Sequence, residues 1–119
     1  MKVKDAIIIL KKRNIPLEWN PYVREVLLDA FLAEFTIRQK TRFGDRIVSL
    51  DAIISLTTEM TNWMKKLMID YGFTEKDTDA FTAILYNTTL EIADKHRVTQ
   101  NELQYSKMVN ILNQNRRSN

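Results

Sequence analysis

The amino-acid sequence predicts an all-α fold, a single-domain bundle of four long helices with a short N-terminal helix in front of them. Apolar residues recur at helical spacing without a break from about Asn20 to about Ile111. The 119 residues include only two glycines and two prolines, too few for the turns that a sheet of short strands requires. One domain over residues 1–119 is the expectation for a chain of this length.

The short N-terminal helix is predicted over Val3–Arg13. Its apolar positions fall on one helical face: Val3, Ala6, Ile7 and Leu10. The β-branched run Ile7–Ile9 would also suit a strand, but charged residues flank it at helical spacing, which favours the helix. Pro16 ends the segment, because a residue that precedes proline is pushed out of the helical conformation.

The second helix is predicted to begin with Asn20 as its cap and Pro21 at its first position. It continues to about Lys40 and carries three rows of apolar residues, which is typical of a central helix contacted on most sides. The third helix is predicted to begin after a cap at Ser49 and to be closed by Gly72.

Two further helices are predicted in the C-terminal part of the chain. Thr74 and Asp77 resemble a capping box and open a helix that reaches about Lys95. Thr99 and Glu102 form a capping box of the T-x-x-E type, which predicts the start of a separate last helix. The apolar stripe of that last helix consists of Leu103, Met108, Val109, Ile111 and Leu112.

The residues that catalysis and cofactor binding usually require are missing from the sequence. It contains no cysteine, and its one histidine, His96, is expected at a helix end and cannot by itself make a zinc site. The nearest approach to a di-iron motif, Glu91-x-x-Asp94, lacks its histidine. Neither a Walker A loop nor a G-x-G-x-x-G motif exists. We therefore expect no enzyme activity, no metal, no cofactor and no small-molecule substrate.

Membrane insertion and secretion are not predicted. No apolar stretch approaches the roughly 18–20 residues that cross a bilayer. The run Ala6–Leu10 is too short for the core of a secretion signal and is followed directly by Lys11. We expect a protein of the cytoplasm or of a macromolecular assembly.

The net charge of +3 is modest, but basic residues gather at three places. These places are the end of the first helix, the region after the second helix, and a polar tail expected at residues 114–119. The candidate residues are Lys11, Lys12, Arg13, Arg38, Lys40, Arg42, Arg46, Arg116 and Arg117. If the three places meet in the fold, they form a patch for phosphate groups or for an acidic protein surface. Charge kept for solubility is the alternative interpretation.

Two other patterns suggest binding. The second helix carries more apolar surface than short neighbours cover, and methionine adapts to varied partners. The candidate interface residues are Leu28, Leu32, Met64 and Met68, although methionines at helical spacing are also typical of a core. Ile92–Ile111 suits a helix-turn-helix with its turn at Val98, but Arg97 occupies the position where such turns usually hold glycine.

The favoured hypothesis is a non-enzymatic protein–protein interaction or assembly subunit, with a protein partner or further copies of itself. A phage or mobile-element accessory or structural component is the expected setting, because small helical proteins without motifs are common there. The alternative is a small basic module that binds nucleic acid through phosphate contacts. Convergence of the basic clusters favours nucleic acid or an acidic partner, whereas their scatter beside an open apolar strip on the second or third helix favours assembly.

Overall fold

The computed structural model describes residues 2–13 and 21–117. Over these ranges the chain forms four helices and no strand, so the predicted all-α class is confirmed. The elements are α1 (Val3–Lys12), α2 (Pro21–Phe43), α3 (Leu50–Asp70) and α4 (Glu75–Arg117). The predicted stop at Pro16 and cap at Asn20 lie outside the described residues.

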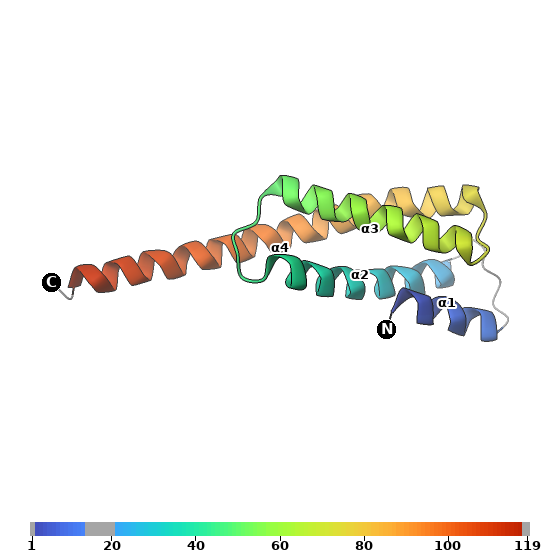
Figure 1. Cartoon of the computed structure of the whole chain (residues 1–119), viewed down its shortest axis with the longest axis horizontal. Coiled ribbons are helices and arrows are strands. Elements are labelled where there is room, and N and C mark those ends of the chain that lie inside the picture. The colour runs from blue at the N-terminus through green and yellow to red at the C-terminus, as the bar shows by residue number, and fades with distance from the viewer. Residues whose placement is uncertain (1, 14–20, 118–119) are drawn as a thin grey trace.

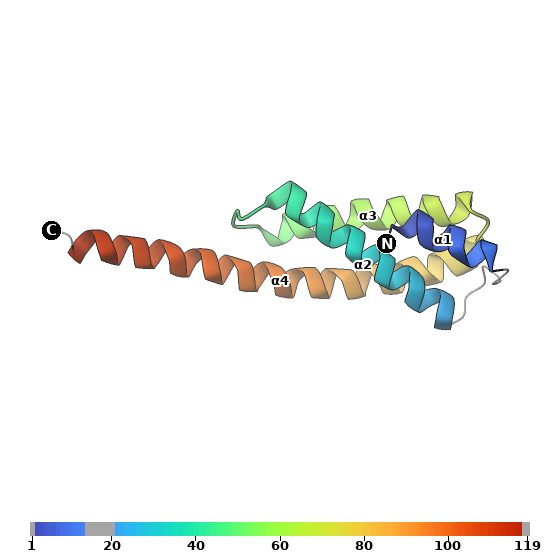
Figure 2. The same cartoon turned by 90° about the horizontal axis from the view of Figure 1, so that it is seen from below.

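The four helices form two hairpins that pack together. Helix α1 runs antiparallel to α2, and α3 runs antiparallel to the first half of α4 (Figures 1 and 2). Helix α3 has 21 residues and α4 has 43, so α3 covers only about half of its partner. The uncovered half of α4 extends past the other helices along the 69 Å long axis of the molecule.

The core lies where the faces of all four helices meet. The face predicted for α1 is the one that it buries, and the row Val23, Leu27, Phe31 and Phe35 is the buried row of α2. Helix α3 contributes Met60, Met64 and Met68, each at most 1% exposed. From α4 the buried apolar residues are Phe81, Leu85 and Ala93. Among the described residues of α4, no apolar side chain after Ala93 belongs to this core.

The caps around α3 are those that the sequence predicts. The Ser49 hydroxyl accepts a hydrogen bond from the amide of Ala52 at 3.2 Å. At the other end Gly72 has a φ of 101°, and the amides of Gly72 and Phe73 bond back to the carbonyls of Ile69 and Met68. This pattern closes a helix and returns the chain sharply. It sets α4 beside α3.

The second predicted capping box does not cap a helix. The Thr99 hydroxyl donates to the carbonyl of Lys95 at 3.1 Å, one turn back inside α4. Glu75 to Arg117 is one unbroken helix that contains no glycine or proline, so nothing in the sequence interrupts its hydrogen bonds. The prediction of a separate fifth helix is therefore wrong. The predicted helix-turn-helix over Ile92–Ile111 and the predicted tail, as far as residue 117, are likewise part of this one continuous helix.

A buried hydroxyl without a partner predicts a stabilising substitution. Among the described residues, Thr78 is fully buried and its Oγ1 has no hydrogen-bond partner. Thr78→Val is expected to raise the free energy of unfolding by about 1 kcal/mol, because it removes an unsatisfied polar atom at nearly constant shape. Urea denaturation measures the change.

Thr57 offers a matched control for that substitution. It is equally buried, but its hydroxyl donates to the carbonyl of Ile53 at 2.8 Å. Thr57→Val should therefore gain less stability than Thr78→Val. Equal changes in the free energy of unfolding of the two variants would mean that the unsatisfied hydroxyl of Thr78 costs no stability.

Candidate protein-binding surface

The last part of α4, residues 102–117, is here called the rod. It projects beyond the body formed by the other helices in both views (Figures 1 and 2). From Tyr105 to Asn115 every side chain is exposed. From Tyr105 to Asn115 the rod is therefore a helix that no other described part of the chain covers.

One face of the rod and of its root is apolar. The stripe consists of Val98, Tyr105, Met108, Val109 and Leu112, which are 36–66% exposed. With Asn101 included, the spacing from Val98 through Tyr105 and Met108 to Leu112 alternates between three and four residues. This spacing is that of the seam along which helices pair in coiled coils.

Up to Asn115 the rest of the rod surface is polar but almost uncharged, and Arg116 and Arg117 follow at the tip. Between Val98 and Asn115 the charged residues are Glu102 and Lys107, one of each sign. Outside the stripe, most of the uncharged positions hold asparagine, glutamine or serine. Leu103 and Ile111 are exposed apolar residues that lie off the stripe. Up to Asn115 the surface accordingly offers apolar contact rather than electrostatic attraction.

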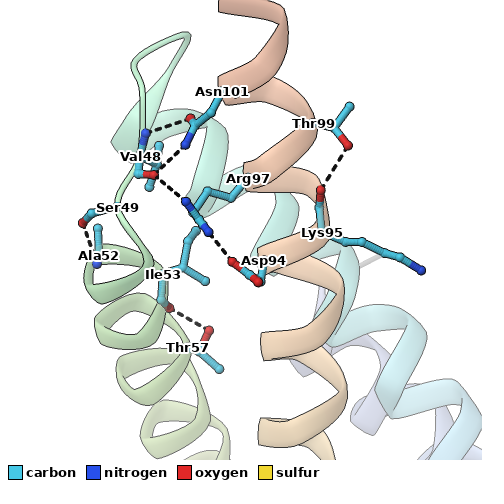
Figure 3. A network of polar contacts seen from close by, with 10 residues as sticks. All are labelled: Val48, Ser49, Ala52, Ile53, Thr57, Asp94, Lys95, Arg97, Thr99 and Asn101. Atoms are coloured by element: carbon cyan, nitrogen blue, oxygen red, sulfur yellow. Dashed lines mark hydrogen bonds and ion pairs between the residues drawn. The ribbon is translucent and has the colours of Figure 1, made fainter. Parts of the chain in front are cut away.

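The root of the rod is fixed by hydrogen bonds to the α2–α3 loop (Figure 3). The Asn101 Nδ2 donates to the carbonyl of Val48 at 2.9 Å, and its Oδ1 accepts from the amide of Val48 at 3.0 Å. Arg97 Nη1 donates to the same carbonyl at 3.3 Å, and its Nε donates to Asp94 Oδ1 at 2.8 Å. We call this group the Val48 clamp. It joins the root of the rod to the α2–α3 loop.

The clamp predicts a specific effect at Asn101. Asn101→Ala removes two hydrogen bonds and leaves the half-buried amide of Val48 without its side-chain acceptor, so a loss of about 1–2 kcal/mol is expected. Hydrogen exchange at the Val48 amide should accelerate. Asn113→Ala, an exposed change farther along the rod, should leave that exchange rate unchanged. Equal rates in the two variants would show that the clamp does not hold the loop.

An open hollow of about 560 Å³ lies beside the clamp, at the root of the rod. Its lining residues are Ile47, Asn101, Glu102, Tyr105 and Ser106. Ile47 of the α2–α3 loop is 60% exposed there. We call this hollow the root groove. Because Tyr105 belongs to both features, the groove and the stripe are continuous.

The predicted interface residues are not the ones left open. Met64 and Met68 are buried in the core, so neither presents a surface to a partner, and that part of the prediction is corrected. Leu28 and Leu32 of α2 are half-buried. The open apolar strip lies on α4 instead of the second or third helix. The reason is that α4 is longer than any helix available to cover it.

The three predicted basic clusters are spread along the molecule. The cluster Lys11, Lys12 and Arg13 ends α1, at the end of the body far from the rod (Figure 1). Residues 38–46 lie at the opposite end of α2, and residues 116–117 form the tip of the rod. The clusters therefore do not converge on one face.

Two arginines of the middle cluster bond within the fold. Arg42 makes two hydrogen bonds to the Glu59 carboxylate, at 2.7 and 3.1 Å, and these lower the pKa of that carboxyl. Arg46 donates to the backbone carbonyls of Arg42 and Phe43. Arg38 instead lines a hollow of about 360 Å³ with Lys2, Lys4, Glu34, Ile37 and Trp63. The sequence did not predict this grouping.

The described residues show no assembled metal site and no membrane span. They contain no group of three or more histidine, cysteine, aspartate or glutamate residues placed to hold a metal ion. His96 is exposed in the middle of α4 and not at a helix end, which corrects its predicted position. None of the described helices is long and apolar enough to cross a membrane. No protein-family model matches the chain, and no curated protein or solved structure shows significant similarity to it.

Proposed function

We propose that this chain is a non-enzymatic assembly subunit that binds another protein chain through the apolar stripe of the rod. The observation that carries the proposal is that α4 extends beyond the other helices and there exposes a seam with the spacing of a coiled coil. Contiguous apolar surface at this spacing is typical of a helix that pairs with a partner.

The energetics of an isolated helix support the same proposal. Most helical stability in proteins comes from packing of an apolar face and not from intrinsic propensity. The rod contains three asparagines together with Tyr105, Ser106, Val109 and Ile111, all weaker helix formers than alanine or leucine. Such a segment is marginal in water, and burial of the stripe against a partner would stabilise it.

The Val48 clamp supports a binding role for the rod by fixing its root. The root is held in place before binding, so only the rest of the rod has to become ordered when a partner docks. Arg97 and Asn101 connect α4 to the loop between two other helices, so the orientation of the rod is tied to the body. The body thus holds the root of the rod in place.

Binding of nucleic acid has less support. The three basic clusters do not meet, and Arg42 and Arg46 are engaged in the fold. The hollow that brings Lys2, Lys4 and Arg38 beside Trp63 also contains the Glu34 carboxylate, which opposes phosphate. Steeply salt-dependent binding of oligonucleotides, lost on Arg38→Ala, would reverse this preference.

The proposal is tested by exchanging apolar residues on and off the stripe. The stripe variant carries Tyr105→Ser and Leu112→Ser, and the control carries Leu103→Ser and Ile111→Ser. All four side chains are 50–66% exposed on the same helix. A tagged chain co-expressed with an untagged copy in its native host is expected to recover a protein chain, either the untagged copy or another protein.

The stripe variant should lose that recovered chain, whereas the control variant should keep it. Circular dichroism confirms in each case that the body remains folded. Equal recovery by the two variants, or no recovered chain with the unmodified protein, would contradict the proposed function.

A further inference from the structure

We infer that the partner covering the stripe is a second copy of this chain, and that the two rods pair antiparallel about a two-fold axis. The inference rests on the proposed function and specifies its partner. It follows from the relation between the root groove, the tip of the rod and the position of the α2–α3 loop.

The two ends of the stripe complement each other in an antiparallel pair. When Tyr105 is set opposite Met108 of the second copy, the seam spacing sets Leu112 of the second copy opposite Asn101. That position lies at the root groove, next to the exposed side chain of Ile47. The apolar tip of each rod therefore enters the hollow at the root of the other, and two-fold symmetry repeats the contact.

The loop position disfavours the parallel arrangement. Asn101 lies on the seam and bonds to Val48, so the α2–α3 loop occupies the stripe side of α4 at the root of the rod (Figure 3). Parallel pairing would bring the loops of both copies together on that side, whereas antiparallel pairing brings to each loop only the tip of the other rod. Antiparallel pairing places the two bodies at opposite ends of the paired rods, since each rod extends well clear of its own body (Figures 1 and 2).

The area available matches a small dimer interface. Each copy contributes the five stripe residues and Ile47, which are exposed apolar side chains. If the six side chains lose on average on the order of 80 Å² of surface, the pair buries close to the ~1,000 Å² at the lower limit for specific interfaces. An interface of that size belongs to the weak and transient class, so the dimer is expected to dissociate on dilution.

The charge on the rod permits self-association. From Val98 to Asn115, the length along which the seams pair, the chain carries one acid and one base, so two copies bring no excess of like charge together there; the other two basic residues of the rod, Arg116 and Arg117, follow at its tip. A partner with a strongly basic or acidic face would find no complementary charge on this segment. A second copy, itself apolar along the same seam, is the better match.

Sedimentation velocity over a wide range of protein concentration tests the dimer. The unmodified chain is expected to change from monomer to dimer as concentration rises. Leu112→Asp should raise the dissociation constant more than about tenfold, because it buries a carboxylate without a partner. Ile111→Asp, a neighbouring exposed position off the stripe, should change it much less.

A monomer at every concentration would overturn the inference. The proposed function would survive that result if the stripe variant still lost a different recovered protein and the control kept it. If the chain is a monomer at every concentration and the stripe variant also recovers the same protein chains as the control, the proposed function is contradicted as well.

Spin labels test the antiparallel orientation, because the chain has no cysteine of its own. Single labels are placed at Ser106→Cys and Asn113→Cys, seven residues apart and therefore on one side of the rod. The antiparallel pair sets the labels at 106 nearly opposite each other, and those at 113 about 20 Å apart along the axis. Similar distances for both sites would mean parallel pairing and would overturn the orientation.

Discussion

Phe31→Ala is expected to lower the free energy of unfolding by about 3–5 kcal/mol, the range for removing a buried aromatic ring from a core. Phe31 of α2 is 0% exposed, and its ring lies 6.2 Å from that of Phe35. Truncation removes packing contacts and leaves a cavity that the rigid helices around it refill only in part. Urea denaturation followed by circular dichroism gives the change.

Ile37→Ala on the same helix is the control for that measurement. Ile37 is 65% exposed, so its truncation should change stability by no more than about 0.5 kcal/mol. A loss below about 1 kcal/mol for Phe31→Ala would contradict the core described for α2.

Ile7→Ala is expected to be the next most damaging change, with a loss of about 2–5 kcal/mol. Helix α1 has only ten residues, too few for a stable helix on its own, so its docking depends on its buried face. Ile7 is 0% exposed at the centre of that face, between Val3 and Leu10. Hydrogen exchange should show the amides of α1 losing protection before those of α3.

The adjacent residue supplies a control of the same type. Ile8 is 38% exposed, and Ile8→Ala should therefore cost much less stability than Ile7→Ala. Both substitutions also favour the helix slightly, since alanine has the higher helix propensity. Equal losses at the two positions would mean that α1 is not docked through the predicted face.

Local signals in the sequence predicted most of the fold. The cap at Ser49, the helix end at Gly72 and the cap at Thr74 each appear in the structure with the expected hydrogen bonds. The reason is that caps and turns depend on a few neighbouring residues, whose chemistry is readable without knowledge of the fold. The buried face of α1 followed from periodicity for the same reason. For α2 the prediction of three contacted rows was wrong in part, because only the row from Val23 to Phe35 is fully buried and Ile37 is 65% exposed.

The break predicted at Thr99 failed because a threonine hydroxyl can bond in two ways. At a cap it accepts from an amide ahead of it, and within a helix it donates to a carbonyl one turn back, as Thr99 does to Lys95. The absence of glycine and proline after Gly72 was the signal that favoured one long helix. A T-x-x-E motif without a helix breaker before it is weak evidence for a new helix.

The binding surface was misplaced because it depends on relative helix lengths. Seam residues such as Met64 and Leu112 look alike in sequence, and only the packing decides which are covered. Helix α3 covers Met64, but its length reaches only about half of α4, so Leu112 stays open. The grouping of Lys2 and Lys4 with Arg38 likewise depends on how α1 lies against α2, which no local pattern specifies.

Hydrogen exchange of the rod amides, residues 104–115, tests the central claim most directly. The claim is that another protein chain, and not the body of this one, keeps the rod helical. In dilute solution, where the chain is monomeric, these amides are expected to exchange far faster than those of α3, and protection should appear on association. Protection equal to that of α3 in the dilute monomer would contradict the account, because the rod would then need no partner.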